Sequence, residues 1–345
     1  MNPNDKFRVV SNFPRMSSVV DAMAYQLRNG ITHIELISGG QRFSYSSILE
    51  KLRKNDALII NVDEPLLYRL CALRYLLPKK SCLLISVDIL LRPPFTLRAR
   101  LCCFLKGLFL KNVDYFFLYF KDTTGYQRYY GIKPEKCVYI PFKVNQLGLI
   151  RSHLATYPEP DDAFEGDKVM AIGRSLRDID TFLHAMSRTG LPGAVLCQSQ
   201  SVMESHGTRI REEAFPPNVT AIKHDGEDES FIKHIASARL VVIPRFYWDI
   251  KSTGISNYLM AMALGKCVII SHGPGASELL KGGEAILVPP EDPDALAMAI
   301  QTAWEQPEFR NKTARRGQQY ALSLGDEDRL LKDILRLAYQ CFMAK

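Results

Sequence analysis

Short runs of apolar residues alternate with stretches of mixed polar and apolar character along most of the 345-residue chain. Uninterrupted apolar runs are typical of strands that are buried on both faces of a parallel sheet, and the stretches between them have the spacing of amphipathic helices. Repeated strand–helix alternation predicts an α/β protein with doubly wound parallel sheets.

The individual elements follow from this pattern. In the first half, strands are expected at FRVVSN, HIELIS, ALIINV, CLLISV, YFFLYF and CVYIPF, with helices near 17–28, 64–77, 97–111 and 122–130. In the second half, strands are expected at KVMAI, AVLCQS, VTAIK, LVVIP, CVIIS and AILVP, with helices near 178–189, 229–238, 254–264, 275–281 and 292–305.

A polar, proline-containing and acidic stretch divides the two series of strands. It reads RSHLATYPEPDDAFEGD and predicts an interdomain linker over 151–167. We therefore expect one domain over 1–150 and another over 168–325, facing each other across a cleft. A final amphipathic helix is expected over 326–345.

Composition excludes several classes of protein. Hydrophobic residues make up 47% of the chain and charged residues 23%, which suits two sizeable cores and excludes disordered, collagenous and disulfide-scaffold proteins. The eight cysteines have no zinc-binding spacing. The start, MNPNDKFRVV, lacks the layout of a secretory signal, and no apolar run is long enough to span a bilayer. A cytoplasmic protein is expected.

The net charge of +7 is concentrated locally. Five basic residues and no acidic residue lie from Arg92 to Lys111. No nucleic-acid-binding pattern accompanies them, so no nucleic-acid partner is expected. The stretch 97–111, LRARLCCFLKGLFLK, fits a helix lying on an anionic membrane surface, which would make the protein peripheral on the inner face of a membrane. A buried helix whose basic side chains reach outward remains the alternative.

Three loops after strands of the second domain carry candidate chemistry. They are GRSLRD at 173–178, DIKSTGIS at 249–256 and SHGPGASE at 271–278. Arginines at a strand end can clamp a diphosphate, and a helix start rich in small residues offers backbone N–H groups to phosphate. Because the carboxyl ends of parallel strands share one edge, the loops should converge on an anionic ligand. Tight turns without a ligand remain the alternative for each loop.

The order of these residues resembles a family. The stretches GRSLRDIDTFLHAM and LVVIPRFYWDIKSTGISNYLMAMALGKCVIISHGPGASELLKGGEAILVPP are similar to the donor-binding half of retaining, nucleotide-sugar-dependent GT-B glycosyltransferases, of the group 1 or family 4 type. SCLLISVDILLRPP resembles the end of the acceptor domain. The resemblance implies two Rossmann-like domains and a C-terminal helix that returns to the first domain.

The resemblance also implies roles for individual residues. Arg174, with Arg177 nearby, would hold the nucleotide diphosphate, and the amides at Thr253, Gly254 and Ile255 would bind phosphate. The family's two glutamates would fall on Ser252 and Met260, so both are absent from this chain. The full set of expected donor-binding residues is Gly173, Arg174, Arg177, Ser252, Thr253, Gly254, Ile255, Ser256, His272, Gly273 and Glu278.

Carboxylates supply the remaining candidates. Asp249 is expected to serve the sugar, and Asp88, at the end of CLLISV, is expected either to contact the acceptor or to cap the following turn. Asp178 and Asp180 match the Asp-x-Asp of metal-dependent transferases, but their place at a helix start favours a structural role. No metal and no cofactor are expected.

These observations favour a hexosyltransferase-type enzyme that uses a nucleotide-diphosphate sugar, with UDP as the expected nucleotide. The acceptor would be a glycan or a lipid-linked sugar in polysaccharide or glycoconjugate assembly. The missing glutamates keep open a sugar-nucleotide-binding module with degenerate activity, and a sugar-phosphate isomerase or epimerase is a weaker third possibility.

Overall fold

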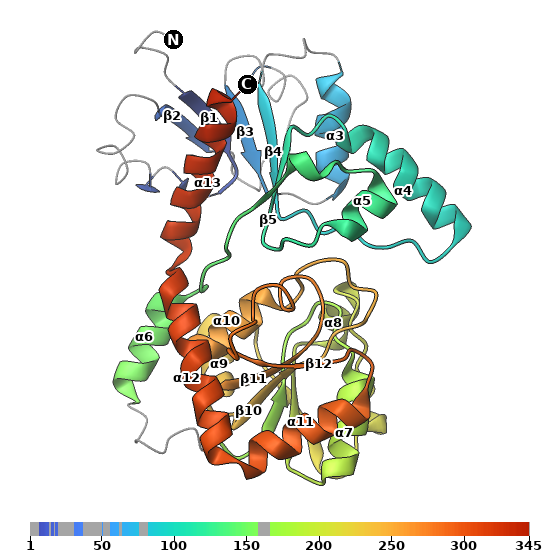
Figure 1. Cartoon of the computed structure of the whole chain (residues 1–345), viewed down its shortest axis with the longest axis vertical. Helices are drawn as coiled ribbons and strands as arrows, with labels where there is room; N and C mark the ends of the chain where they lie inside the picture. The colour runs from blue at the N-terminus through green and yellow to red at the C-terminus, as the bar shows by residue number, and fades with distance from the viewer. Residues whose placement is uncertain are drawn as a thin grey trace. The chain divides into compact units, whose positions relative to one another are not determined.

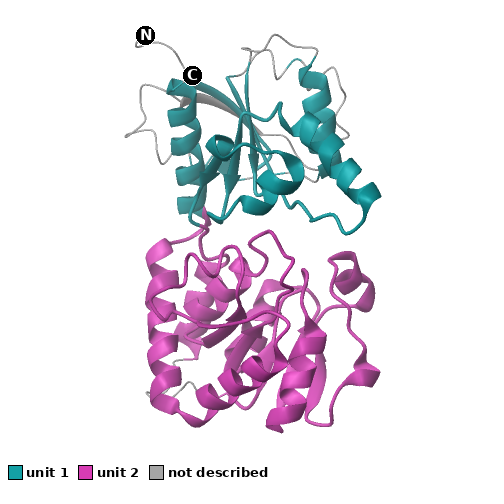
Figure 2. Ribbon diagram, turned by 45° about the vertical axis from the view of Figure 1, so that its right-hand side comes forward, with its two compact units in different colours: residues 1–141, 328–345 teal, residues 142–327 magenta. Residues whose placement is uncertain are grey.

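A computed structural model describes residues 7–13, 15–16, 18–19, 31–36, 50, 56–61, 64–75, 82–157 and 166–344 of the chain. The chain divides into two compact units, coloured separately in Figure 2. Unit 1 contains Met1–Pro141 and Asp328–Lys345, and unit 2 contains Phe142–Glu327. Each unit is described by itself below.

Unit 1 is built on a parallel sheet with the strand order β2-β1-β3-β4-β5-β6. Its strands are β1 (Phe7–Ser11), β2 (Ile31–Leu36), β3 (Ala57–Ile60), β4 (Leu83–Val87), β5 (Tyr115–Leu118) and β6 (Cys137–Tyr139). Its helices are α3 (Glu64–Arg74), α4 (Leu97–Leu110), α5 (Thr124–Tyr130), the short 3₁₀ turn η1 (Pro134–Lys136) and most of α13 (Glu327–Met343). Every residue of β3 and β4 is buried, as expected for a parallel sheet covered on both faces.

The C-terminal helix α13 belongs to unit 1 from Asp328 onward. The ring of Phe7 in β1 packs against the rings of Tyr339 and Phe342, with centroid distances of 5.6 and 4.9 Å. Leu330, Leu331, Ile334, Leu335 and Ala338 form the buried stripe of the helix. The first strand and the last helix thereby pack together, and Figure 1 shows α13 beside β1.

Unit 2 has the strand order β12-β11-β10-β7-β8-β9, which is the Rossmann order when the strands are counted within the unit. Its strands are β7 (Val169–Ala171), β8 (Gly193–Cys197), β9 (Val219–Lys223), β10 (Leu240–Ile243), β11 (Cys267–Ser271) and β12 (Ile286–Val288). Its helices are α6 (Leu147–Thr156), α7 (Ile179–Thr189), α8 (Gln200–Ser205), η2 (Glu212–Ala214), α9 (Asp228–Ala236), α10 (Ile255–Ala263), α11 (Pro293–Glu305) and α12 (Pro307–Leu324).

The predicted fold class is confirmed, and every strand predicted from an apolar run is present. The expected division at 151–167 is wrong in its first part. Residues 151–156 lie in α6, which buries Leu147 and Ile150, and unit 2 begins at Phe142. Apart from Ser18 and Val19, the helix expected near 17–28 lies outside the described residues.

The helix expected at 275–281 is replaced by turns. Gly273 and Gly275 both have positive φ values, 150° and 78°, which a right-handed helix does not accommodate. The side chain of Glu278 also accepts a hydrogen bond from the Gly275 N–H at 2.8 Å, which holds the turn locally. No helix in the described part of the chain is both long enough and apolar enough to cross a membrane.

Candidate active site

The candidate site lies at the carboxyl edge of the unit 2 sheet, where the chain changes direction. Strands β7 and β10 are neighbours, but β7 leads on to β8 at one side and β10 leads on to β11 at the other. Ligands of such sheets bind in the crevice opened by this reversal. The loop after β7 and the loop after β10 are joined there by an antiparallel β-bridge between Arg177 and Arg245.

Arg177 lies inside the protein rather than on the rim. Its side chain donates from Nε to the carbonyl of Ile172 at 3.0 Å and from Nη1 to the carbonyl of Ser175 at 2.6 Å. Only 1% of the residue is exposed. Burial and the nearby charge of Arg245 lower the pKa of the guanidinium, and Asp249 opposes them. Arg177 therefore holds the β7 turn in shape and places a positive charge beneath it.

Arg245, immediately after β10, was not assigned a role from the sequence. Its guanidinium contacts Oδ2 of Asp249 at 3.0 Å and the carbonyls of Lys251 and Pro274 at 2.6 and 3.0 Å. The two side chains of the ion pair are 1% and 0% exposed. One guanidinium thus connects the β10 loop with the β11 loop. Its place directly after an apolar strand was a usable signal.

The expected role of Asp249 requires correction. Its carboxylate accepts hydrogen bonds from Arg245, from the Lys251 N–H at 3.2 Å and from the Thr253 hydroxyl. Both carboxylate oxygens are engaged inside the loop, so the residue braces the loop and is not placed to act on a sugar.

Arg174 is the exposed arginine of the β7 turn. Its Nη1 lies 3.5 Å from Oε1 of Gln198, at the end of β8. Thr208 fixes the turn, since its hydroxyl donates to the Arg174 carbonyl at 2.7 Å and accepts from the Arg177 N–H at 2.9 Å. Burial, with the charges of His234 and Arg174, lowers the pKa of His224. The turn therefore presents one arginine to solvent and keeps the other below.

The β10 loop ends at the first turn of α10, where the sequence predicted a phosphate site. Ser252, Thr253 and Ile255 are buried, and Gly254 has a φ of 97°. The Ser256 hydroxyl accepts a hydrogen bond from Asn145 Nδ2 at 3.1 Å. Met260, at the position where the resemblance implies a glutamate, is buried in the same helix.

Glycines cover the two buried arginines. A Cβ atom on Gly173 would lie 2.5 Å from Nε of Arg177, and one on Gly273 would lie 3.0 Å from Nη1 of Arg245. At Gly254 the nearest atoms would be Cγ2 of Ile243 at 2.9 Å and Nη2 of Arg177 at 3.2 Å. The loops after β7, β10 and β11 therefore each place a glycine, with no side chain, against a guanidinium group.

The β11 loop is held largely by its own side chains. Ser277 accepts a hydrogen bond from the Gly273 N–H at 2.9 Å, and its hydroxyl lies 3.1 Å from Nδ1 of His272. Glu278 caps the Gly275 N–H, so one of its oxygens already has a structural partner. His272 is the exposed member of this group.

In unit 1, Asp88 follows β4 with a φ of 52°, a left-handed conformation that is uncommon for a residue with a side chain. Its N–H donates to the Phe117 carbonyl at 2.8 Å. Burial, with the charge of Asp88, raises the pKa of Tyr119 well above its usual value. Such backbone conformations cluster at functional sites, which keeps Asp88 a candidate for acceptor binding.

The Asp178–Asp180 pair has structural partners. Asp178 caps α7 by accepting a hydrogen bond from the Thr181 N–H at 3.1 Å, and Asp180 forms an exposed ion pair with Arg211 at 2.9 Å. Within the described ranges, no three His, Cys, Asp or Glu side chains lie close enough together to hold a metal ion.

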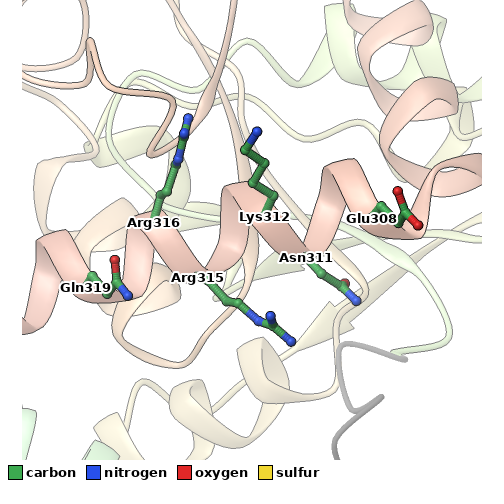
Figure 3. A pocket seen from close by; sticks show the side chains of 6 residues that line it. All are labelled: Glu308, Asn311, Lys312, Arg315, Arg316 and Gln319. Carbon is green, nitrogen blue, oxygen red and sulfur yellow. The ribbon is translucent and has the colours of Figure 1, made fainter.

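A second basic region lies on α12. An open pocket of about 440 Å³ lies there. Figure 3 shows that Lys312 and Arg316 point to one side of the helix and Asn311 and Arg315 to the other. Arg316 donates to the Gly282 carbonyl at 3.1 Å. The side chains diverge, so they form no common ligand site.

Comparisons with known proteins agree with this architecture. Residues 206–320 match the family described as glycosyl transferases group 1, and no curated protein matches significantly. Sucrose-phosphate synthase from Thermosynechococcus elongatus has a similar structure, with a TM-score of 0.65 and 16% identity over 99% of this chain and 100% of that one.

Two further solved structures are similar over nearly their whole length. Anabaena HepE in complex with UDP-glucose has a TM-score of 0.65 and 13% identity over 97% of this chain and 99% of its own. A trehalose 6-phosphate synthase from Burkholderia multivorans has a TM-score of 0.62 and 14% identity over 99% of this chain and 100% of its own. The chain therefore has the GT-B fold, and the match of its residues 206–320 to glycosyl transferases group 1 supports an enzyme of the transferase class.

Proposed function

We propose that the protein transfers a sugar from a nucleotide-diphosphate sugar to a hydroxyl group of a glycan or a lipid-linked acceptor, with retention of configuration. The group 1 match and the likeness to HepE, whose structure contains UDP-glucose, support this assignment. Polysaccharide or glycoconjugate assembly in the cytoplasm, next to a membrane, is the setting that fits such an acceptor.

The observation that carries the proposal is the excess of buried positive charge below the loops. Arg177 and Arg245 are each 1% exposed. Asp249 forms an ion pair with Arg245, whereas Arg177 donates its side-chain hydrogen bonds to backbone carbonyls. A buried charge is costly unless it is paired, so this arrangement favours an anion above the glycines. The diphosphate of the donor supplies that anion.

Arg174 and the start of α10 complete the diphosphate site. Arg174 on the rim offers charge-assisted hydrogen bonds, and the first turn of α10 after Gly254 offers the positive end of a helix dipole. These groups stabilise the charge that develops on the departing diphosphate, which is the role a metal ion has in other transferases. The nucleotide sugar is then the co-substrate, and the reaction requires neither a metal nor a cofactor.

The test is nucleotide binding followed by transfer. Binding of nucleoside diphosphates, matched nucleosides and nucleotide-diphosphate sugars is measured by calorimetry, and release of nucleotide is then measured with glycan and lipid-linked acceptors. We expect diphosphates to bind at least about tenfold more tightly than nucleosides, since charge-assisted bonds contribute about 1.5–3 kcal/mol. Equal affinities would contradict the site, and tight donor binding without transfer to any acceptor would favour the binding module.

A further inference from the structure

Helix α4 of unit 1 exposes apolar side chains that a soluble helix would normally bury. Leu97 is 82% exposed, Leu101 60%, Phe104 61% and Leu105 48%. We call these four residues the apolar stripe. Phe95, two residues before the start of α4, is 67% exposed and extends the apolar surface beyond the helix.

Helical geometry places the apolar stripe on the side of α4 that faces away from the core. At roughly 3.6 residues per turn, its members share one side, and the buried residues Cys103, Gly107 and Leu110 lie on the opposite side. The same geometry places Arg98 and Arg100 on either flank of the apolar stripe, and both are exposed. In Figure 1, α4 runs along the side of unit 1 beyond α3 and α5.

The charge around the apolar stripe has one sign. Residues 89–113 include five basic residues and no acidic residue. Lys106 pairs with Glu64 of α3 at 2.8 Å, on the side of the helix that faces the unit. Apolar side chains flanked by arginines on both sides are typical of a helix that lies in the interface of an anionic bilayer. A second copy of this chain is a poorer partner, because pairing would bring two basic helices together.

We propose that α4 docks the protein onto an anionic lipid bilayer. The apolar stripe enters the boundary between head groups and acyl chains, while Arg98 and Arg100 contact lipid phosphates. This inference rests on the proposed function in one respect: it makes a lipid-linked sugar, presented at the same surface, the acceptor class.

Vesicle sedimentation tests the docking. The full chain is mixed with vesicles of equal parts phosphatidylglycerol and phosphatidylcholine, or of phosphatidylcholine alone. We expect at least about tenfold tighter binding to the anionic vesicles, weakened by salt. The double variant Leu101→Asp, Phe104→Asp should lose at least about tenfold in affinity. Met298→Asp, a matched change at a 68% exposed position of α11, should bind as the unchanged protein does.

Binding of a nucleoside diphosphate to the same variants separates this inference from the proposed function. Vesicle binding that the double variant lacks, with nucleotide affinity unchanged, would support docking through α4. Absent vesicle binding by the unchanged protein, or equal binding by the double variant, would overturn it. A dimer that Leu101→Asp dissociates, with no vesicle binding, would also overturn it and identify a self-association face.

Discussion

The loops after β4 in unit 1 and after β10 in unit 2 both lie at the carboxyl edge of a parallel sheet, but they are held differently. In unit 1, the Tyr126 hydroxyl donates to the Ile89 carbonyl and accepts from the Leu91 N–H at 3.3 Å. The Tyr130 hydroxyl donates to the Arg92 carbonyl at 2.7 Å. In unit 2, the buried Arg245–Asp249 ion pair holds the loop after β10.

The two loops differ in whether the groups that hold their shape also carry charge. Phenol hydroxyls fix a loop without adding charge, so the charged side chains of the unit 1 loop are its own Asp88 and Arg92. Guanidinium groups fix a loop and also leave positive charge in a medium of low dielectric, where an anion is attracted strongly. The first arrangement suits a sugar hydroxyl, and the second suits a diphosphate.

Removing the carboxylate from the unit 2 loop should have the largest effect. Asp249→Ala leaves the buried guanidinium of Arg245 without its carboxylate partner, and breaking a buried pair costs about 3–5 kcal/mol. Chemical unfolding measures the change in free energy. The matched control is Asp180→Ala, which breaks the exposed pair with Arg211 and should change stability by less than about 1 kcal/mol. Similar losses in the two variants would remove the distinction between the loops.

Arg174→Ala tests the rim of the same site. Because Arg174 is exposed, the free energy of unfolding should stay within about 0.5 kcal/mol of the original. Nucleoside diphosphate should bind about tenfold to a hundredfold more weakly, from the loss of about 1.5–3 kcal/mol of charge-assisted hydrogen bonding. Arg211→Ala removes an exposed arginine of the same unit and should leave affinity unchanged. If the original protein, Arg174→Ala and Arg211→Ala bound nucleoside diphosphate with the same affinity, the diphosphate site would lie elsewhere.

Tyr126→Phe tests the neutral loop. It deprives the Ile89 carbonyl and the Leu91 N–H of a buried partner, so the protein should lose about 1–2 kcal/mol of stability without losing affinity for nucleotide. Tyr129→Phe, in the same helix and only partly buried, should change stability by less than about 0.5 kcal/mol. A loss of donor affinity in Tyr126→Phe would show that the two loops are not independent.

Chelation should have the smallest effect of all. If arginines and a helix start hold the diphosphate, EDTA should leave nucleotide binding and sugar transfer unchanged. The measurement is the rate of nucleotide release with and without the chelator. Activity that EDTA abolishes and a divalent ion restores would return Asp178 and Asp180 to consideration as ligands.

The sheets could be predicted from the sequence because buried parallel strands are continuous apolar runs. The position of the candidate site could also be predicted, since it lies at the carboxyl ends of these strands. The roles of individual residues could not be predicted. Arg174 and Arg177 are the same residue type three positions apart, and the conformation of the turn, with its positive φ at Gly173 and its hydrogen bonds to Thr208, places Arg177 rather than Arg174 in the core. Helix α6 was missed because its second half, from Arg151, runs into the polar, proline-containing stretch that was assigned to the linker.

The glycines above the guanidiniums limit the order in which this site can change during evolution. A Cβ atom at Gly173 would clash with Nδ2 of Asn257 as well as with Arg177, and one at Gly273 would meet Arg245. Both glycines also have positive φ values, so a side chain is strained there even after the arginine is lost. A lineage can therefore lose an arginine and keep its glycine, while the reverse order passes through a clash. Related chains should retain each glycine more often than the arginine below it.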